Sequence, residues 1–236
     1  MTTRLGIIGG SSLSKSSPFA VTREEEIETP YGPPSSDMEL GDRVAFLRRH
    51  GADYRIPPHR VNHRANIWAL KETGVSVVVG TSSVGSLHVE TAPGSLVVPD
   101  DYVSLAEIPT FFDDEVRHIT PTLDHGLREQ LVDAAKMRGA TVREGGVYVQ
   151  TRGPRLETKA EIRELQRFGE VVGMTMAAEA TLAQELGLPY ASLCGVDNYA
   201  HGVTKEPLAF EDIRRTQESN MRVVRGVLQA FVEAAA

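Results

Sequence analysis

Residues 75–79 constrain the fold of this chain more than any other segment. Their run of Val-Ser-Val-Val-Val is typical of a strand that is covered on both faces of its sheet. Helical segments to cover such a sheet are predicted at residues 126–138, 158–168, 177–186 and 210–235. Strands that alternate with helices predict an α/β fold with a mixed central sheet, and chemistry on the loops at its strand ends.

Composition excludes several classes of protein. The chain has 236 residues, of which 41% are hydrophobic, so we treat 1–236 as a single domain. A net charge of −7 argues against a nucleic-acid partner, and no apolar run approaches the roughly 18 residues of a membrane span. The only cysteine, Cys194, permits neither an internal disulfide nor a cysteine-rich metal site. We expect a cytoplasmic protein with neither nucleic-acid nor membrane partners.

Three apolar runs end in residues that suit an anion. The run 4–8 leads into Gly9-Gly10-Ser11, the run 44–47 into Arg48-Arg49-His50-Gly51, and the run 75–79 into a small-residue turn at 80–86. Backbone amides, hydroxyls and guanidinium groups all bind oxyanions. Each segment alone is equally compatible with a plain turn or a solvated cluster, and none has the dinucleotide fingerprint. Together they predict an oxyanion cradle.

Polar residues also follow apolar runs in the last third of the chain. Thr151-Arg-Gly-Pro-Arg-Leu-Glu157 comes after a strand predicted at 146–149, Gly173-Met-Thr175 after a short apolar run, and Asp197-Asn-Tyr199 after a strand predicted at 190–194. We interpret these three segments as the sugar and base half of a nucleoside site.

The ordered motifs resemble those of the trimeric purine nucleoside phosphorylases, and in particular their 5′-methylthioadenosine phosphorylase branch. The segments that carry the resemblance are Gly9-Gly-Ser11, Arg49-His-Gly51, Val61-Asn-His-Arg-Ala-Asn-Ile-Trp-Ala-Leu-Lys71, Gly85-Ser-Leu87, Gly153-Pro-Arg155 and Gly173-Met-Thr175. The resemblance implies cleavage of an N-glycosidic bond by inorganic phosphate, which gives a free base and a sugar 1-phosphate. It implies no protein nucleophile, cofactor or metal, and a homotrimer or a dimer of trimers with active sites at subunit interfaces.

The same resemblance assigns roles to individual residues. The phosphate ligands that it implies are Ser11, Arg49, His50, Ser82, Ser83 and Thr175. Met174 would lie against the ribose, Phe210 would line the 5′ pocket, and His118 would come from a loop that reaches into a neighbouring subunit. The base would meet Leu156, Glu157, Asp197 and Asn198, and Asp197 would be the catalytic group that faces purine N7.

Two carboxylates in the base half point to different purines. Asp197 favours a 6-aminopurine, although Asp197-Asn-Tyr199 departs from the Asp-Tyr-Asp of adenine-specific relatives, while Glu157 matches the 6-oxopurine members. An aromatic residue at 210 suits an apolar 5′ substituent. We predict phosphorolysis of 5′-deoxy-5′-methylthioadenosine, or of a close 5′-modified adenosine, to adenine and 5-methylthioribose 1-phosphate. The alternative is a 6-oxopurine phosphorylase that acts on 5′-methylthioinosine, inosine or guanosine, and a remote one is a non-catalytic nucleoside sensor.

Overall fold

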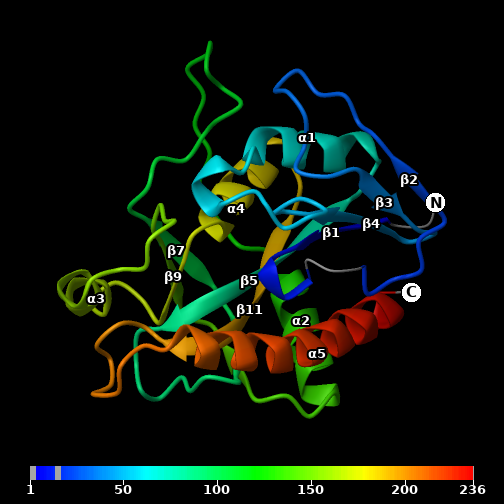
Figure 1. Cartoon of the computed structure of the whole chain (residues 1–236). Coiled ribbons are helices and arrows are strands. Elements are labelled where there is room, and N and C mark those ends of the chain that lie inside the picture. Colours follow the sequence, from blue (N-terminus) through cyan, green and yellow to red (C-terminus); the bar gives the residue numbers. More distant parts are fainter. Residues whose placement is uncertain (1–3, 14–16, 236) are drawn as a thin grey trace.

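The computed structural model describes residues 4–13 and 17–235, so residues 1–3, 14–16 and 236 of the predicted domain lie outside the described residues. Within these ranges, eleven strands form one sheet with helices on both faces (Figure 1). The strands are β1 (Leu5–Gly9), β2 (Arg23–Glu25), β3 (Met38–Leu40), β4 (Val44–Arg48), β5 (Val77–Ser86), β6 (Leu96–Val98), β7 (Asp101–Ser104), β8 (Val142–Glu144), β9 (Val147–Gln150), β10 (Val171–Gly173) and β11 (Tyr190–Tyr199). The helices are α1 (His63–Glu72), α2 (His125–Met137), α3 (Lys159–Leu165), α4 (Met176–Glu185) and α5 (Phe210–Ala234), with 3₁₀ turns at Ser11–Leu13 and Pro58–Arg60.

The sheet is mixed, as the sequence predicts. Its main path runs β2-β3-β4-β1-β5-β10-β9-β7, and β11 pairs with β5 and β6. The strands β4, β1, β5 and β11 pair in parallel, whereas β10 runs antiparallel to β5. The parallel strands therefore end at one edge, which is where α/β proteins build their ligand sites.

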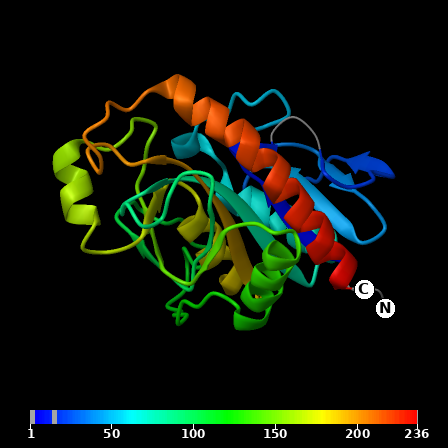
Figure 2. The same cartoon turned by 90° about the horizontal axis from the view of Figure 1, so that it is seen from below.

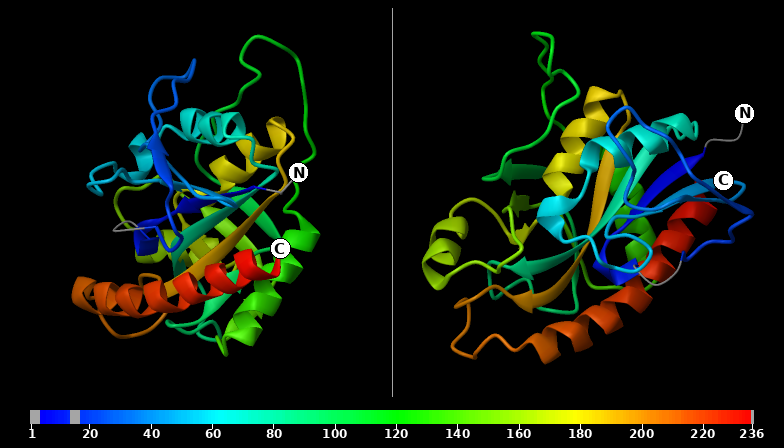
Figure 3. Two further views of the ribbon diagram at one scale, coloured as in Figure 1. Left: turned by 90° about the vertical axis from the view of Figure 1, so that its right-hand side faces the viewer. Right: turned by 45° about the horizontal axis from the view of Figure 1, so that its top comes forward.

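Helices cover both faces of β5. On one face, Val78 and Val84 pack in a core cluster with Ile67 of α1 and residues of α4. On the other face, Val79 packs with Leu228 of α5 and residues of α2. Figure 3 shows α1 and α4 on one side of the sheet and α5 with α2 on the other, and Figure 2 shows α5 and α2 from below. The prediction of a strand buried on both faces is confirmed.

The small-residue segment 80–86 is not a turn, so that prediction is wrong. It continues β5 to Ser86 and pairs in parallel with β11, where Ser82 lies opposite Cys194 and Ser83 opposite Gly195. The ladder with β11 runs along the whole segment, so the segment stays extended instead of turning. Gly80 lacks a side chain for a packing reason, because an added Cβ there would overlap the hydroxyl of Tyr190.

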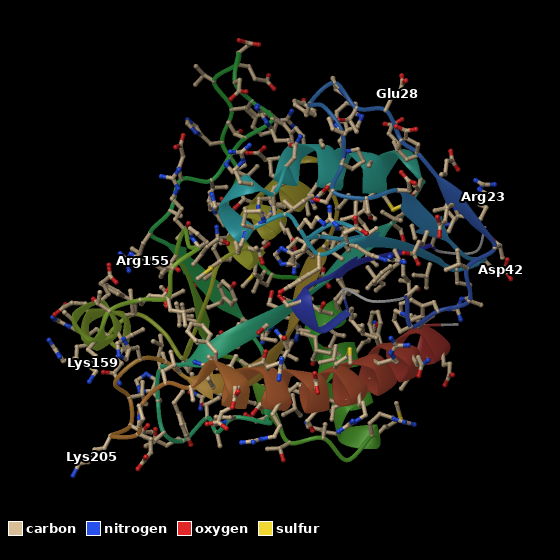
Figure 4. All side chains as sticks on the ribbon, viewed as in Figure 1. Arg23, Glu28, Asp42, Arg155, Lys159 and Lys205 are labelled. Carbon is tan, nitrogen blue, oxygen red and sulfur yellow. The ribbon has the colours of Figure 1, made fainter. Side chains whose placement is uncertain are left out.

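The remaining segments surround this frame. Residues 110–121 form an irregular loop, which projects away from the sheet at the top of Figure 1. Lys159 of α3, Arg155 and Lys205 lie along one side of the molecule, whereas Arg23 and Asp42 lie at the opposite end (Figure 4). Within residues 4–13 and 17–235, no helix is long and apolar enough to cross a membrane.

Candidate active site

A cavity of about 210 Å³ lies where β1, β4 and β5 end. It brings together most of the residues that the sequence predicts for the site. These residues are Ser11, Arg49, His50, Ser83, Leu156, Glu157, Met174, Thr175, Asn198 and Phe210. Their side chains come from five strands or strand ends, the start of α5 and the loop before α3, so the cavity depends on the whole fold. Three predicted residues are missing from its lining, namely Ser82, His118 and Asp197.

Arg49, a predicted phosphate ligand, is held in place by a buried carboxylate. Its Nε and Nη2 donate to the two carboxylate oxygens of Glu179, at 2.8 Å for Nη2, and its Nη1 donates to the carbonyl of Thr81 at 2.7 Å. Burial disfavours the charged guanidinium, but Glu179 outweighs it, and the pKa of Arg49 is raised above its ordinary value. Arg49 therefore stays charged, and its charge is balanced within the protein.

Glu179 is a residue of the site that the sequence interpretation missed. It is fully buried in α4, and its Oε2 also accepts from the hydroxyl of Tyr190 at 2.9 Å. The signal lay in the sequence Met-Ala-Ala-Glu-Ala, because one carboxylate inside an apolar helix requires a buried cation as its partner.

The ring of His50 lines the cavity beside Arg49. Its Nδ1 lies 2.8 Å from the carbonyl oxygen of Ile56, and the ring of Tyr54 packs edge-on against it. Burial, together with the charge of Arg49, lowers the pKa of His50 to about 4. The imidazole is therefore neutral near pH 7, and because a carbonyl only accepts, its proton is on Nδ1.

Thr175 precedes α4, but the amide groups that begin this helix are satisfied inside the protein. The side-chain oxygen of Gln150 accepts from the amides of Ala177 and Ala178 at 2.7 and 3.3 Å. The amide of Thr175 donates to the hydroxyl of Tyr148 at 3.3 Å. A ligand therefore meets the side chain of Thr175 rather than an open helix N-terminus.

Glu157 and Asn198 lie in the lining, in the half predicted to hold the base. Glu157 accepts from the hydroxyl of Thr151 at 2.5 Å, and Asn198 donates from Nδ2 to the carbonyl of Tyr199 at 2.8 Å. His201, which the sequence interpretation did not select, lines the cavity and lies with Nδ1 3.2 Å from the carbonyl of Glu157. This half therefore presents a carboxylate and an amide to a ligand.

Asp197 is absent from the lining of this cavity, but it lines an adjoining hollow that shares Asn198, His201 and Leu208 with it. Its carboxylate accepts from the hydroxyl of Ser83 and, at 2.7 Å, from Nδ2 of Asn220. Burial raises the pKa of Asp197, while these hydrogen bonds act to lower it. The register of β11 against β5 shifts between Val196 and Asn198, so Asp197 lies at an irregularity of this ladder. The role of Asp197 at purine N7 stays a prediction.

The two other absent residues also keep predicted roles only. Ser82 is buried, and its hydroxyl has no hydrogen-bond partner in the described part of the chain. His118 is exposed on the loop that projects from the body and is absent from the cavity lining.

Comparison with known proteins identifies the family. Residues 4–233 match the phosphorylase superfamily. The chain is 43% identical to a probable 6-oxopurine nucleoside phosphorylase of Archaeoglobus fulgidus over 97% of this chain and 96% of the relative. It is 41% identical to a probable S-methyl-5′-thioinosine phosphorylase of Methanopyrus kandleri, over 98% and 90%. A methylthioadenosine phosphorylase of Schistosoma mansoni in complex with adenine superposes with a TM-score of 0.89 at 27% identity, over 99% and 92%.

The chain therefore belongs to the phosphorylase superfamily. Within it, the enzyme is a nucleoside phosphorylase of the purine nucleoside and methylthioadenosine group, a pentosyltransferase, as the motifs of the sequence predict.

Proposed function

We propose that the enzyme cleaves 6-oxopurine nucleosides with inorganic phosphate. The observation that carries this proposal is that Glu157 and Asn198 line the cavity, whereas the carboxylate of Asp197 is bound by Ser83 and Asn220. From the sequence alone we favour a 6-aminopurine because of Asp197. That preference weakens once Asp197 is outside the lining.

The chemistry of Glu157 distinguishes the two kinds of purine. A 6-oxopurine carries a proton on N1, and guanine adds a 2-amino group, so both present donors to an ionised carboxylate. A 6-aminopurine has a lone pair at N1, which repels the same carboxylate. Glu157 therefore favours hypoxanthine or guanine as the base.

Asn198 fits the same assignment. Its amide both donates and accepts, so it can bind N7 or O6 of a 6-oxopurine without being protonated. As the glycosidic bond breaks, negative charge grows on the base and positive charge on the sugar. An amide donor at the base and an anionic phosphate at the sugar would stabilise both charges in the transition state.

Phosphate would occupy the end of the cavity lined by Ser11, Arg49, His50 and Thr175. Among the lining residues, these supply hydroxyls and a fixed guanidinium, which are donors that suit an oxyanion. Met174 lines the cavity and directly precedes Thr175 in the sequence. This position suits contact with the ribose, which connects the phosphate to the base.

An apolar 5′ substituent is favoured over a hydroxyl. Leu208, just before α5, and Phe210 and Ile213, in the first turn of α5, line the cavity, and Phe210 is 74% exposed. These apolar side chains offer a 5′ hydroxyl no hydrogen-bond partner, whereas a methylthio group would pack against them without needing one. We therefore propose 5′-methylthioinosine as a better substrate than inosine.

One assay tests both parts of this proposal. The purified enzyme is incubated with phosphate and, in turn, 5′-methylthioinosine, inosine, 5′-methylthioadenosine or adenosine, and release of the free base is followed by chromatography. The 6-oxopurine substrates should react with the higher kcat/KM, and 5′-methylthioinosine should exceed inosine. Phosphate-dependent release of adenine alone would restore the 6-aminopurine assignment, and binding without turnover would support the nucleoside sensor.

The assembly and setting of the enzyme are also proposals. Large apolar side chains are exposed on the loop 105–121 and at the cavity mouth, including Leu105 at 59% and Val116 at 95%. We propose a homotrimer or a dimer of trimers, which would cover such side chains and bring His118 to the active site of a neighbouring subunit. We also propose that the enzyme is cytoplasmic and that its reaction uses neither a cofactor nor a metal. Light scattering of the purified protein tests the assembly, and a monomer at assay concentrations would contradict it.

A further inference from the structure

The anion end of the cavity has little net charge of its own. Arg49 carries one positive charge, but the Glu179 carboxylate binds it through both oxygens, and both side chains are buried. Hydrogenphosphate and sulfate are tetrahedral dianions of similar size. A guanidinium that is already balanced attracts both of them alike, so electrostatic attraction at this end does not select between them.

His50 differs from the other groups at this end, because it presents an acceptor. The hydrogen bond to the carbonyl of Ile56 fixes the proton on Nδ1, and the neutral ring then carries a lone pair on Nε2. Ser11, Arg49 and Thr175 can donate hydrogen bonds to an anion, whereas Nε2 of the neutral ring can only accept a hydrogen bond from a ligand that carries a proton.

We propose that Nε2 of His50 accepts a hydrogen bond from the P–OH group of hydrogenphosphate and thereby selects phosphate over sulfate. The inference rests on the proposed placement of phosphate at this end of the cavity. Sulfate has no proton to offer at neutral pH, so one of its oxygens would face the Nε2 lone pair and be repelled. His50 is thus a specificity-determining residue for the co-substrate.

The same contact orients the nucleophile. A hydrogenphosphate dianion has one protonated oxygen and three that share its negative charge. When the protonated oxygen is held at His50, the oxygens that face the rest of the cavity are the nucleophilic ones. No proton is transferred to His50 in this arrangement, because the P–OH proton remains on phosphate throughout.

Protonation of His50 would reverse its preference. The charged groups that face the ring are Arg49, which disfavours the imidazolium, and Glu179, which favours it, and His63 lies nearby. Once protonated, Nε2 becomes a donor and binds the unprotonated oxygen of sulfate. Sulfate affinity should therefore rise as the pH falls from 7 toward 5, a range in which sulfate remains a dianion.

The test compares phosphate and sulfate binding to the full-length wild type and to His50→Asn at matched ionic strength. Asparagine keeps a donor near the Nδ1 position but lacks an atom at Nε2. Dissociation constants come from calorimetry with each anion alone, and phosphate KM and nucleoside KM come from the assay. In His50→Asn, phosphate affinity should fall about ten- to hundredfold, and sulfate affinity should stay within about threefold or increase. The pH dependence of sulfate binding should disappear.

Two further variants separate the ways in which the inference can fail. Thr175→Val removes a hydroxyl donor and should weaken both anions; if it weakens neither, the proposed placement of phosphate is wrong and the inference falls with it. If Thr175→Val weakens both anions and His50→Asn does so in parallel, the placement holds, but His50 is a donor. A change confined to nucleoside KM would assign Nε2 to a sugar hydroxyl and would overturn the inference. His50→Gln returns an amide oxygen to this position without a titrating group, so it should recover phosphate selectivity but not the pH dependence.

Discussion

Nη2 of Arg49 lies 2.8 Å from Oε2 of Glu179, and the two side chains are 1% and 0% exposed. The pair joins the end of β4 to α4, and Arg49 lines the cavity where we propose that phosphate binds. The hydroxyl of Tyr190, at the start of β11, donates a further hydrogen bond to Oε2 of Glu179. One buried pair therefore fixes the guanidinium orientation and connects three elements of the fold.

Replacing Glu179 with Ala should destabilise the enzyme strongly. The variant leaves the Arg49 charge buried and unpaired, and breaking a buried pair in this way costs about 3–5 kcal/mol. Urea unfolding of the wild type and Glu179→Ala measures the difference. Arg155→Ala serves as the control, because the pair of Arg155 with Glu161 is exposed to solvent and its loss should have a much smaller effect. Equal losses in the two variants would show that the buried pair has no special weight.

Gly80→Ala and Gly126→Ala should change stability in opposite directions. A Cβ at Gly80 would overlap the hydroxyl of Tyr190 and approach Oε2 of Glu179 to 2.8 Å, so overpacking should cost about 1–3 kcal/mol. A Cβ at Gly126, in the first turn of α2, would meet its nearest neighbour at an ordinary 3.5 Å. Alanine should stabilise that helix by about 0.5–1 kcal/mol. Thermal unfolding of both variants tests the contrast, and a neutral Gly80→Ala would contradict it.

The sequence predicts those features that one segment determines by itself. The β-branched run at 75–79 indicates a buried strand, and the periodicity at 126–138 matches α2 closely. The residue pattern of a single segment does not predict which distant segment it pairs with. The sequence does not reveal that β11 holds 80–86 in an extended ladder, nor that Arg49 meets a carboxylate 130 residues away. Likewise, the hydrogen bond between Asp197 and Asn220 joins β11 to α5, two elements that are separate in the sequence.

The free energy of unfolding should fall as the pH is lowered from about 6.5 to about 4. Burial lowers the pKa of His63, like that of His50, to about 4, so the unfolded chain binds protons in this window that the folded protein does not. Each histidine should contribute a slope of up to about 1.4 kcal/mol per pH unit. Asp197, whose pKa is raised, acts with the opposite sign, since its contribution is lost as the pH rises.

A His63 variant isolates this effect from other titrating groups. In urea unfolding at several pH values, His63→Asn should show a shallower slope than the wild type between pH 6.5 and 4, whatever its absolute stability. Asp197 is present in both proteins, so its contribution largely cancels in the difference. Superimposable slopes would mean that His63 titrates alike in the folded and unfolded states.

Glu157→Gln should impair the reaction on 6-oxopurines selectively. The amide of glutamine is a weaker acceptor than a carboxylate for N1–H, and its NH₂ group would face a donor in one of its two orientations. Loss of a hydrogen bond to a charged group predicts a fall in kcat/KM for 5′-methylthioinosine of about ten- to hundredfold. Glu161→Gln is the matched control, because Glu161 lies on α3 and pairs with Arg155 outside the cavity. A similar loss in both variants would remove Glu157 from base recognition.

Asn198→Asp should shift base preference, whereas Asp197→Asn should not. A carboxylate at position 198, inside the lining, would accept from a 6-amino group and repel a 6-oxo group, so the ratio of kcat/KM for 5′-methylthioinosine to that for 5′-methylthioadenosine should fall at least about tenfold. Asparagine at 197 would leave one of the donors from Ser83 and Asn220 poorly matched and should cost about 1–3 kcal/mol of stability, with the ratio unchanged within about threefold. Steady-state kinetics on both substrates and urea unfolding measure the two effects. If Asp197→Asn changes the ratio and Asn198→Asp does not, the base is read by Asp197, and the 6-aminopurine assignment regains its support.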